Sequence, residues 1–118
     1  MTGTQSYLVG DYSETYQTFK PTKPEQYNWA YEIFDKWGDD PDHVAMVWVS
    51  DADESKEITY REFTERSKRL ANALSGIGAQ PGDRVLTMMH RVPEWWEIVL
   101  ASIRGRFVSA PGTTLMTP

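Results

Sequence analysis

One stretch near the C-terminal end, residues 81–112, constrains the fold of this 118-residue chain more than any other part. Pro81 and Gly82 begin it with a turn signal, because proline fixes φ and glycine accepts a positive φ. The apolar run at residues 85–89 is typical of a short strand that is covered on both faces. Pro93 then suits the first turn of a helix, where the missing N–H of proline costs nothing.

The residues after this proline complete a strand–helix–strand unit. Apolar side chains recur there at helical spacing, at Trp96, Val99, Leu100 and Ile103. A second strand follows at residues 107–110. The pattern predicts a βαβ unit with two parallel strands and a right-handed crossover. We expect Trp95 and Trp96 to lie in the core, with Trp96 packed over the strand at residues 85–89, and Glu97 to face solvent.

A helix and a hairpin precede this unit. The helix is expected to begin near Asn28 and to end at Gly38. Strands at residues 44–49 and 57–58, joined by a polar connection, predict the hairpin. A longer helix is expected at residues 59–77, because a threonine followed three residues later by a glutamate forms a capping-box pattern.

Residues 1–26 differ from the rest of the chain in composition. They are polar, rich in Thr, Ser, Tyr and Gln, and close with two Lys and two Pro residues. We interpret them as an extended N-terminal arm that lies along a larger body. Residues 27–118 are then an α/β unit, whose parallel strands need cover on both faces.

Composition and charge exclude several classes of function. A net charge of −5 disfavours a nucleic-acid or anionic-membrane surface, which needs clustered Lys and Arg. The absence of cysteine excludes disulfides, and two histidines without cysteine do not make an ordinary zinc site, so no metal site is predicted. No apolar run is long enough for a membrane span, and the first twenty residues have no signal or transit pattern. A cytoplasmic location is therefore expected.

Five short sequence motifs occur in a characteristic order. They are Asn28-Trp29-Ala30-Tyr31, Thr59-Tyr60-Arg61-Glu62-Phe63, Gly82-Asp83-Arg84-Val85, Arg91-Val92-Pro93-Glu94-Trp95-Trp96 and Pro111-Gly112-Thr113-Thr114. In this order and at this spacing they resemble the N-terminal region of acyl-CoA synthetases. The resemblance is greatest to the medium-chain branch of the adenylate-forming, AMP-binding superfamily, and it extends over residues 27–118.

The resemblance implies the partial N-terminal domain of an adenylate-forming enzyme. The intact family enzyme activates a fatty or other carboxylic acid with ATP and Mg²⁺ to an acyl-adenylate, then transfers the acyl group to CoA. Three functional features of the family lie downstream of the Pro-Gly-Thr-Thr motif. They are the phosphate loop, the acidic residue that binds the ribose, and the catalytic lysine. We therefore expect this chain to be an opening segment that is inactive alone, binds none of these cofactors by itself and contains no catalytic residue.

Four residues are candidate substrate contacts. Gly112, Thr113 and Thr114 follow a strand end, and in the resembled family this segment lies near the channels for the acyl group and CoA; a structural turn is an equally good interpretation. Many medium-chain relatives carry Gln where this chain has Leu115, so no polar contact to CoA is assigned there. Arg91 stands at the predicted carboxyl end of a strand, where ligands gather in α/β sheets.

A simpler role is also open for Arg91 and for its neighbour. Arg91 is expected to pair with Glu94 or Glu97 near the start of the helix. His90 has no acidic or cysteine partner nearby in sequence, so we interpret it as structural.

The resemblance also predicts partners. They are the remainder of the synthetase or a full-length homologue, and a small carboxylic acid, with no nucleic acid and no membrane span. The alternative from another class is a non-catalytic interaction module, a truncated relative that binds a full-length synthetase. A gene fragment without function is the third possibility, and the sequence does not separate these three.

Overall fold

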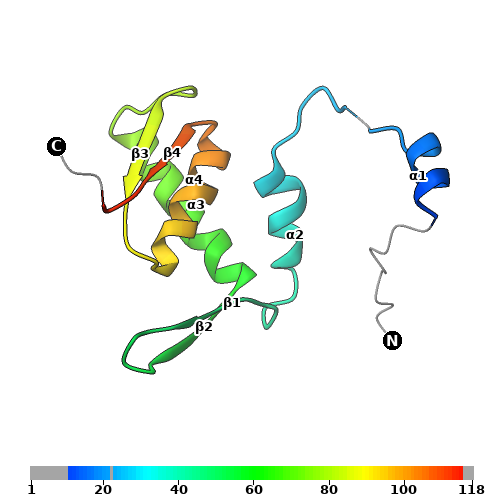
Figure 1. Ribbon diagram of the computed structural model, residues 1–118. Helices are drawn as coiled ribbons and strands as arrows, with labels where there is room; N and C mark the ends of the chain where they lie inside the picture. Colours follow the sequence, from blue (N-terminus) through cyan, green and yellow to red (C-terminus); the bar gives the residue numbers. More distant parts are fainter. Residues whose placement is uncertain (1–10, 22, 116–118) are drawn as a thin grey trace.

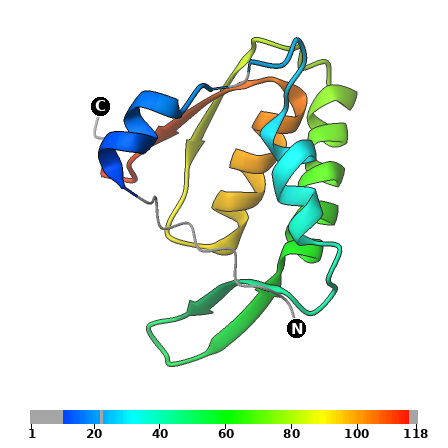
Figure 2. The same cartoon turned by 90° about the vertical axis from the view of Figure 1, so that its right-hand side faces the viewer.

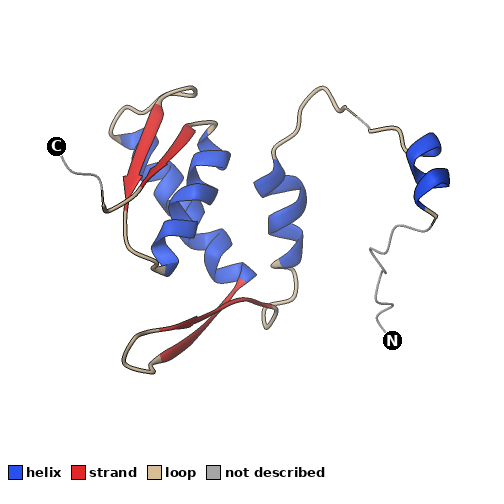
Figure 3. Ribbon diagram, viewed as in Figure 1, coloured by secondary structure: helices blue, strands red, loops and turns tan. Residues whose placement is uncertain are grey.

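The computed structural model describes residues 11–21 and 23–115 of the chain. Its two longest helices, α3 (Tyr60–Gly76) and α4 (Pro93–Gly105), pack along each other (Figure 1). The strands of the described residues form two separate pairs, one antiparallel and one parallel, which are drawn in red in Figure 3. This mixture of helices and strands confirms the predicted α/β class.

The parallel pair forms the predicted βαβ unit. Strand β3 (Arg84–Met88) leads through a short loop into α4, and β4 (Val108–Gly112) returns beside β3 in parallel register. Pro93 occupies the first turn of α4, as its missing N–H allows. At the other end of the helix, Arg106 adopts a left-handed conformation with φ of 59° and ends α4 before the chain enters β4.

The hairpin is also confirmed. Strand β1 (Val44–Val49) pairs antiparallel with β2 (Ser55–Thr59), and the second strand is longer than the expected residues 57–58. The register shifts between Val44 and Met46, which is the irregularity of a β-bulge. The hairpin projects from the N-terminal end of α3 and lies away from the parallel pair (Figure 3).

Helix α3 begins with the capping box that the sequence predicts. The Thr59 Oγ1 accepts a hydrogen bond from the Glu62 backbone N–H at 3.2 Å, and the Glu62 carboxylate accepts one from the Thr59 backbone N–H at 2.9 Å. Two backbone N–H groups at the start of the helix, which have no partner within the helix, are thus hydrogen-bonded. The helix ends at Gly76, and Gly78 follows with a φ of +102°, a conformation that glycine adopts without strain.

A shorter helical segment lies beside α3 and α4 (Figure 2). It opens as one π-helical turn, η1 (Ala30–Phe34), and continues as α2 (Asp35–Trp37). The segment ends at Gly38, as expected, but begins at Ala30, two residues after the predicted Asn28. The Asn28 Oδ1 accepts a hydrogen bond from the Ala30 backbone N–H at 3.1 Å, just before the segment.

One segment of the predicted N-terminal arm, residues 1–26, is helical. A helix, α1 (Tyr12–Thr18), forms there, with the Asp11 side chain accepting a hydrogen bond from the Glu14 backbone N–H. This N-cap is the local signal that the sequence interpretation missed. Helix α1 has no buried residue and stands apart from the other helices in Figure 1. The division of the chain at residue 26 stays a prediction, and residues 1–10 lie outside the described part.

The core sits between the helices and the hairpin. Phe34, Ile58, Phe63 and Leu100 form its buried cluster. By contrast, the sheet of β3 and β4 is covered on one face alone, because Thr87 is buried while Leu86 is 65% exposed. The expectation of a strand covered on both faces is therefore wrong for the described residues. The radius of gyration, 17.7 Å, exceeds the roughly 13.5 Å of a compact domain of this length, which is consistent with the exposed face and the detached α1.

Candidate functional site

The carboxyl ends of the two parallel strands define one edge of the sheet. Met88 and Gly112 are the last residue pair of the parallel register. The loop before α4 and the segment after β4 therefore leave the sheet at the same edge. In open α/β sheets this is the edge where ligands bind.

The Gly-Thr-Thr segment lies at this edge. Gly112 is half-buried, whereas Thr113 and Thr114 are exposed. The Thr113 Oγ1 accepts a hydrogen bond from the Leu115 backbone N–H at 3.1 Å, which is a turn formed by the side chain. The second hydroxyl, on Thr114, is available at the surface. Substrate contact through these residues stays a prediction.

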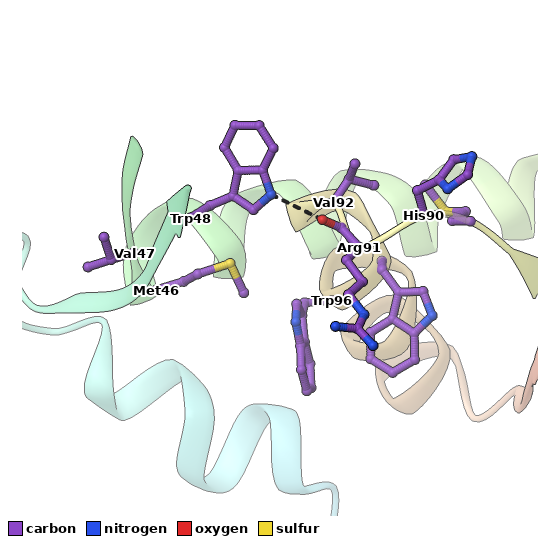
Figure 4. Close-up of a pocket in the computed structure, with 9 residues that line it drawn as sticks. Met46, Val47, Trp48, His90, Arg91, Val92 and Trp96 are labelled. Atoms are coloured by element: carbon purple, nitrogen blue, oxygen red, sulfur yellow. Dashed lines mark hydrogen bonds between the residues drawn. The ribbon is translucent and has the colours of Figure 1, made fainter. Parts of the chain in front are cut away.

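Arg91 lies in a different feature, an open groove of about 440 Å³ (Figure 4). The groove runs between β1, the loop after β3 and the first turn of α4. Its lining is mainly aromatic and aliphatic: Met46, Val47, Trp48, Met89, His90, Arg91, Val92, Trp95 and Trp96. The structure does not bring Gly112, Thr113 or Thr114 into this lining, so the four predicted contacts fall into two places.

The hairpin and the loop are joined across this groove. The indole Nε1 of Trp48 donates a hydrogen bond to the backbone carbonyl of Arg91 at 3.1 Å (Figure 4). Trp48 lies on β1, 43 residues earlier in the chain, so this contact ties the loop to the hairpin in addition to the loop's own bond from the Val92 N–H to the His90 carbonyl. It therefore holds the β1 wall of the groove next to the wall formed by the loop that carries Arg91.

The expected ion pair of Arg91 is not formed within residues 11–21 and 23–115. The Glu97 carboxylate instead accepts a hydrogen bond from Arg66 of α3 at 3.1 Å, and Arg66 also pairs with Glu62 at 3.4 Å. The Glu97 side chain is 14% exposed, so its predicted solvent-facing position is wrong as well. The position of Glu97 follows from the packing of α3 against the side of α4 that carries it.

The core positions predicted for the two tryptophans are also corrected. Trp96 is 50% exposed and Trp95 is half-buried. Their rings meet edge to face, with centroids 4.8 Å apart, and both line the groove. The buried surface of α4 consists mainly of smaller residues and one arginine: Leu100, Ala101, Ser102 and Arg104. These let neighbouring elements approach closely, and Trp96 is left on the groove side.

His90 is exposed and lines the same groove. Its imidazole has no hydrogen-bond partner among the described residues, and its assignment as structural stays a prediction. His43, the other histidine, directly precedes β1, and its ring lies tilted against that of Tyr60 with centroids 4.6 Å apart.

Sequence reasoning missed a buried charge network between three helices. The Arg104 side chain is fully buried and donates through both terminal nitrogens to the Asp35 carboxylate, while its Nε donates to Ser67 Oγ at 2.9 Å. Thr64 and Lys68 also reach Asp35, each at 3.0 Å. The signal in the sequence was a single arginine on the otherwise apolar and small face of α4.

The network sets the ionisation of Asp35. Burial by itself would raise the pKa of this carboxyl, but hydrogen bonds from Arg104 and Lys68, with the charge of Arg104, outweigh burial and lower the pKa from its ordinary value of 3.8. The Tyr31 ring adds a cation–π contact at 5.0 Å to the guanidinium. The ion pair joins α2 to α4 and has a structural role.

The described residues do not by themselves fit the family's cofactors. Among them, no three side chains of His, Asp or Glu gather closely enough to hold a metal ion. The sequence contains no Gly-rich phosphate loop, so these residues form no backbone cradle for the phosphates of ATP. Within the described part, no helix is both long and apolar enough to cross a membrane.

Comparison with known proteins supplies the family. Residues 33–118 match the model of the AMP-binding enzyme family. The human mitochondrial acyl-coenzyme A synthetase ACSM2B is 38% identical over 100 residues, covering 79% of this chain and 17% of that protein. The human mitochondrial acyl-coenzyme A synthetase ACSM3 is 35% identical over 114 residues, covering 91% of this chain and 20% of that protein.

A solved structure agrees in fold. The crystal structure of an acyl-CoA synthetase from Brucella canis superposes with a TM-score of 0.83 at 22% identity, covering 93% of this chain and 22% of that one. The chain thus spans about a fifth of the length of the relatives that it matches. It belongs to the AMP-binding enzyme family, in which it corresponds to an N-terminal segment of the medium-chain acyl-CoA synthetase branch.

Proposed function

We propose that this chain is the N-terminal part of an acid–CoA ligase. In the intact enzyme, a carboxylate oxygen of a fatty or other carboxylic acid attacks the α-phosphorus of ATP, which releases pyrophosphate and leaves an acyl-adenylate. The sulfur of CoA then takes the acyl group, and AMP leaves. The observation that carries the proposal is the match of residues 33–118 to the AMP-binding enzyme family, whose relatives along this segment are named acyl-CoA synthetases.

In this proposal the chain contributes substrate positioning and no chemical step. Gly112, Thr113 and Thr114 stand at the carboxyl edge of the sheet, where backbone can approach a ligand closely. Arg91 stands in the neighbouring loop and carries a fixed positive charge. ATP, Mg²⁺ and CoA depend on the remainder of the enzyme, so the chain alone is expected to be inactive.

The cellular compartment stays a prediction. The compartment predicted from the sequence is the cytoplasm. The relatives ACSM2B and ACSM3 carry the word mitochondrial in their names. Tagging the natural gene product and fractionating cells would decide between the two compartments.

A second candidate is favoured by one observation. Apolar side chains are exposed on the open face of the sheet, with Leu86 at 65%, Val108 at 50% and Met88 at 47%. Contiguous apolar surface of this kind marks an interaction site. The alternative is therefore a non-catalytic module that uses this face to bind a full-length synthetase.

A segment exchange would test the proposal. Residues 27–118 replace the matching segment of human ACSM2B, and thioester formation from medium-chain acids or benzoate is measured with ATP and CoA. We expect the chimera to form acyl-CoA, and expect the Thr113→Ala, Thr114→Ala double variant of the chimera to lose kcat/KM without a change in melting temperature. Arg69→Gln, on an exposed part of α3, is the matched control and should leave kcat/KM unchanged.

The outcome also separates the two candidates. A folded but inactive chimera would contradict the ligase proposal. If, in addition, the isolated chain co-elutes with unmodified ACSM2B, and a Leu86→Lys variant does not, the interaction module is the better account.

A further inference from the structure

The groove beside the sheet edge combines two kinds of surface. Three indole rings and two thioethers provide an apolar floor and walls, on Trp48, Trp95, Trp96, Met46 and Met89. Its volume of about 440 Å³ falls within the range of roughly 300–1,000 Å³ that small-molecule sites in proteins occupy. Such a lining fits the hydrocarbon or aromatic body of a ligand.

The same groove holds one permanent positive charge. Arg91 is the lining residue that is charged at every physiological pH, and within the described residues no carboxylate lies within 4.0 Å of its guanidinium. Two acidic residues were expected to neutralise it: Glu97 pairs with Arg66 instead, and Glu94 lies beyond the 4.0 Å limit of an ion pair with Arg91. A guanidinium in this situation fits a carboxylate, which it can hold through two parallel hydrogen bonds.

The backbone beneath this charge is fixed. The bond from Trp48 Nε1 to the Arg91 carbonyl holds the loop against β1, while the Arg91 side chain extends toward Trp96 at the start of α4 (Figure 4). The apolar lining also continues beyond the groove. A second cleft of about 330 Å³, between α2 and α4, shares Met46 and Trp96 with it, so these two side chains border both apolar spaces.

We propose that this groove binds a monocarboxylic acid directly, without ATP. The tryptophan-rich lining takes the aliphatic or aromatic body, and Arg91 takes the carboxylate. The proposal rests on the proposed function, because it assigns to this chain a site for the acid class that an acid–CoA ligase consumes. It makes Arg91 a determinant of the charge of the ligand, and Trp96 a determinant of the length of its body.

The proposal is tested by direct binding to the full 118-residue chain. Octanoate is titrated at submicellar concentration and followed by tryptophan fluorescence and by the indole N–H signals in an NMR spectrum. Octanol tests the body without the charge, and acetate tests the charge without the body. We expect saturable octanoate binding with the largest shifts at Trp48, Trp95 and Trp96, and octanol binding that is about threefold to tenfold weaker, as for a partly exposed charge-assisted contact. We expect no acetate binding in the same range.

Variants at one position separate charge from packing. Arg91→Gln should lower octanoate affinity to the level of octanol and leave octanol affinity unchanged. Arg91→Lys, which keeps the charge but not the planar fork, should give an intermediate affinity. Arg69→Gln, at an exposed position of α3, is the matched control and should bind octanoate like the parent chain.

Three results would overturn the proposal. They are octanoate binding that does not saturate, an Arg91→Gln variant that weakens octanol as much as octanoate, and an Arg69→Gln variant that behaves like Arg91→Gln. Near-UV circular dichroism of each variant confirms that the fold is intact. The binding test is independent of catalysis. If the chimera is active but the isolated chain does not bind octanoate, only the groove proposal is contradicted. If the isolated chain binds octanoate but the folded chimera is inactive, only the ligase proposal is contradicted.

Discussion

The two sides of α4 are stabilised in opposite ways. Toward α2 and α3, a buried arginine is satisfied by Asp35 and Ser67, and the hydrophobic cluster around Leu100 closes the space. Toward β3 and β4, the helix covers one face of a two-stranded sheet whose other face leaves Leu86 exposed. The helical side has its partners within the chain, whereas the sheet side presents apolar surface that a partner could bury. Substitutions on the helical side should therefore change stability most.

The largest effect is expected from Arg104→Ala. This change removes the partner of Asp35 and leaves Ser67 Oγ without its donor. Breaking a buried ion pair from one side costs about 3–5 kcal/mol, a large fraction of the stability of any small domain. Urea unfolding followed by circular dichroism measures the change. Arg69→Ala, whose side chain is 79% exposed, should stay within about 0.5 kcal/mol, and equal effects of the two would contradict the buried network.

A second pair of substitutions sharpens the assignment of the faces of α4. Leu100→Ala should cost about 2–5 kcal/mol, because Leu100 is 4% exposed within the core cluster. Trp96→Ala should cost roughly half of the 3–5 kcal/mol that is usual for a buried aromatic, since half of its surface already meets solvent. Unfolding free energies at pH 7 decide the order. A larger loss for Trp96→Ala would return Trp96 to the core and contradict the groove.

Two glycines at helix ends should respond with opposite signs. A Cβ at Gly105 would lie 2.3 Å from the ring of the buried Phe107, so Gly105→Ala should cost about 1–3 kcal/mol through overpacking. A Cβ at Gly76 meets open space, so Gly76→Ala in the last turn of α3 should stabilise by up to about 1 kcal/mol. Melting temperatures of both variants measure this. A neutral or stabilising Gly105→Ala would show that the joint between α4 and β4 is looser than the structure has it, and a destabilising Gly76→Ala would contradict the open space at Gly76.

The smallest effect is a pH dependence of the helical side. The pKa of Asp35 is lowered below 3.8 in the folded chain, so its ionised form stabilises the fold above about pH 4. As the pH falls below 3.8 toward the lower folded pKa, the unfolded chain binds the proton first and this contribution is lost. The gap in unfolding free energy between the parent chain and Asp35→Asn should narrow between about pH 7 and about pH 3. A constant gap would show that Asp35 does not titrate differently in the two states.

The local elements were predictable from sequence because their signals are local. Each of these signals acts within a few residues of the chain. They are the capping box of Thr59 and Glu62, the proline that opens α4, and the alternation of strand and turn residues. The buried face of α4 was not predictable from the sequence, because helical spacing indicates an apolar stripe but not which neighbouring element covers it. Arg104 shows the same limit: its partner Asp35 lies 69 residues away, and only the packing of three helices brings them together.

The candidate site was predictable in part. The carboxyl edge of the sheet follows from parallel pairing, and Arg91 was placed near it. The groove was not foreseen, because one wall comes from the hairpin through a contact that spans 43 residues. Whether Gly112, Thr113 and Thr114 touch a substrate stays a prediction.

The most direct test of the account is acid-dependent exchange of pyrophosphate into ATP. The isolated chain is assayed with medium-chain fatty acids and benzoate, beside the ACSM2B chimera that carries residues 27–118 of this chain. The account predicts background exchange for the chain alone, which has no phosphate loop, and acid-dependent exchange for the chimera. Exchange above background by the isolated chain, or none by a folded chimera, would contradict the claim that this chain is the substrate-positioning N-terminal part of an acid–CoA ligase.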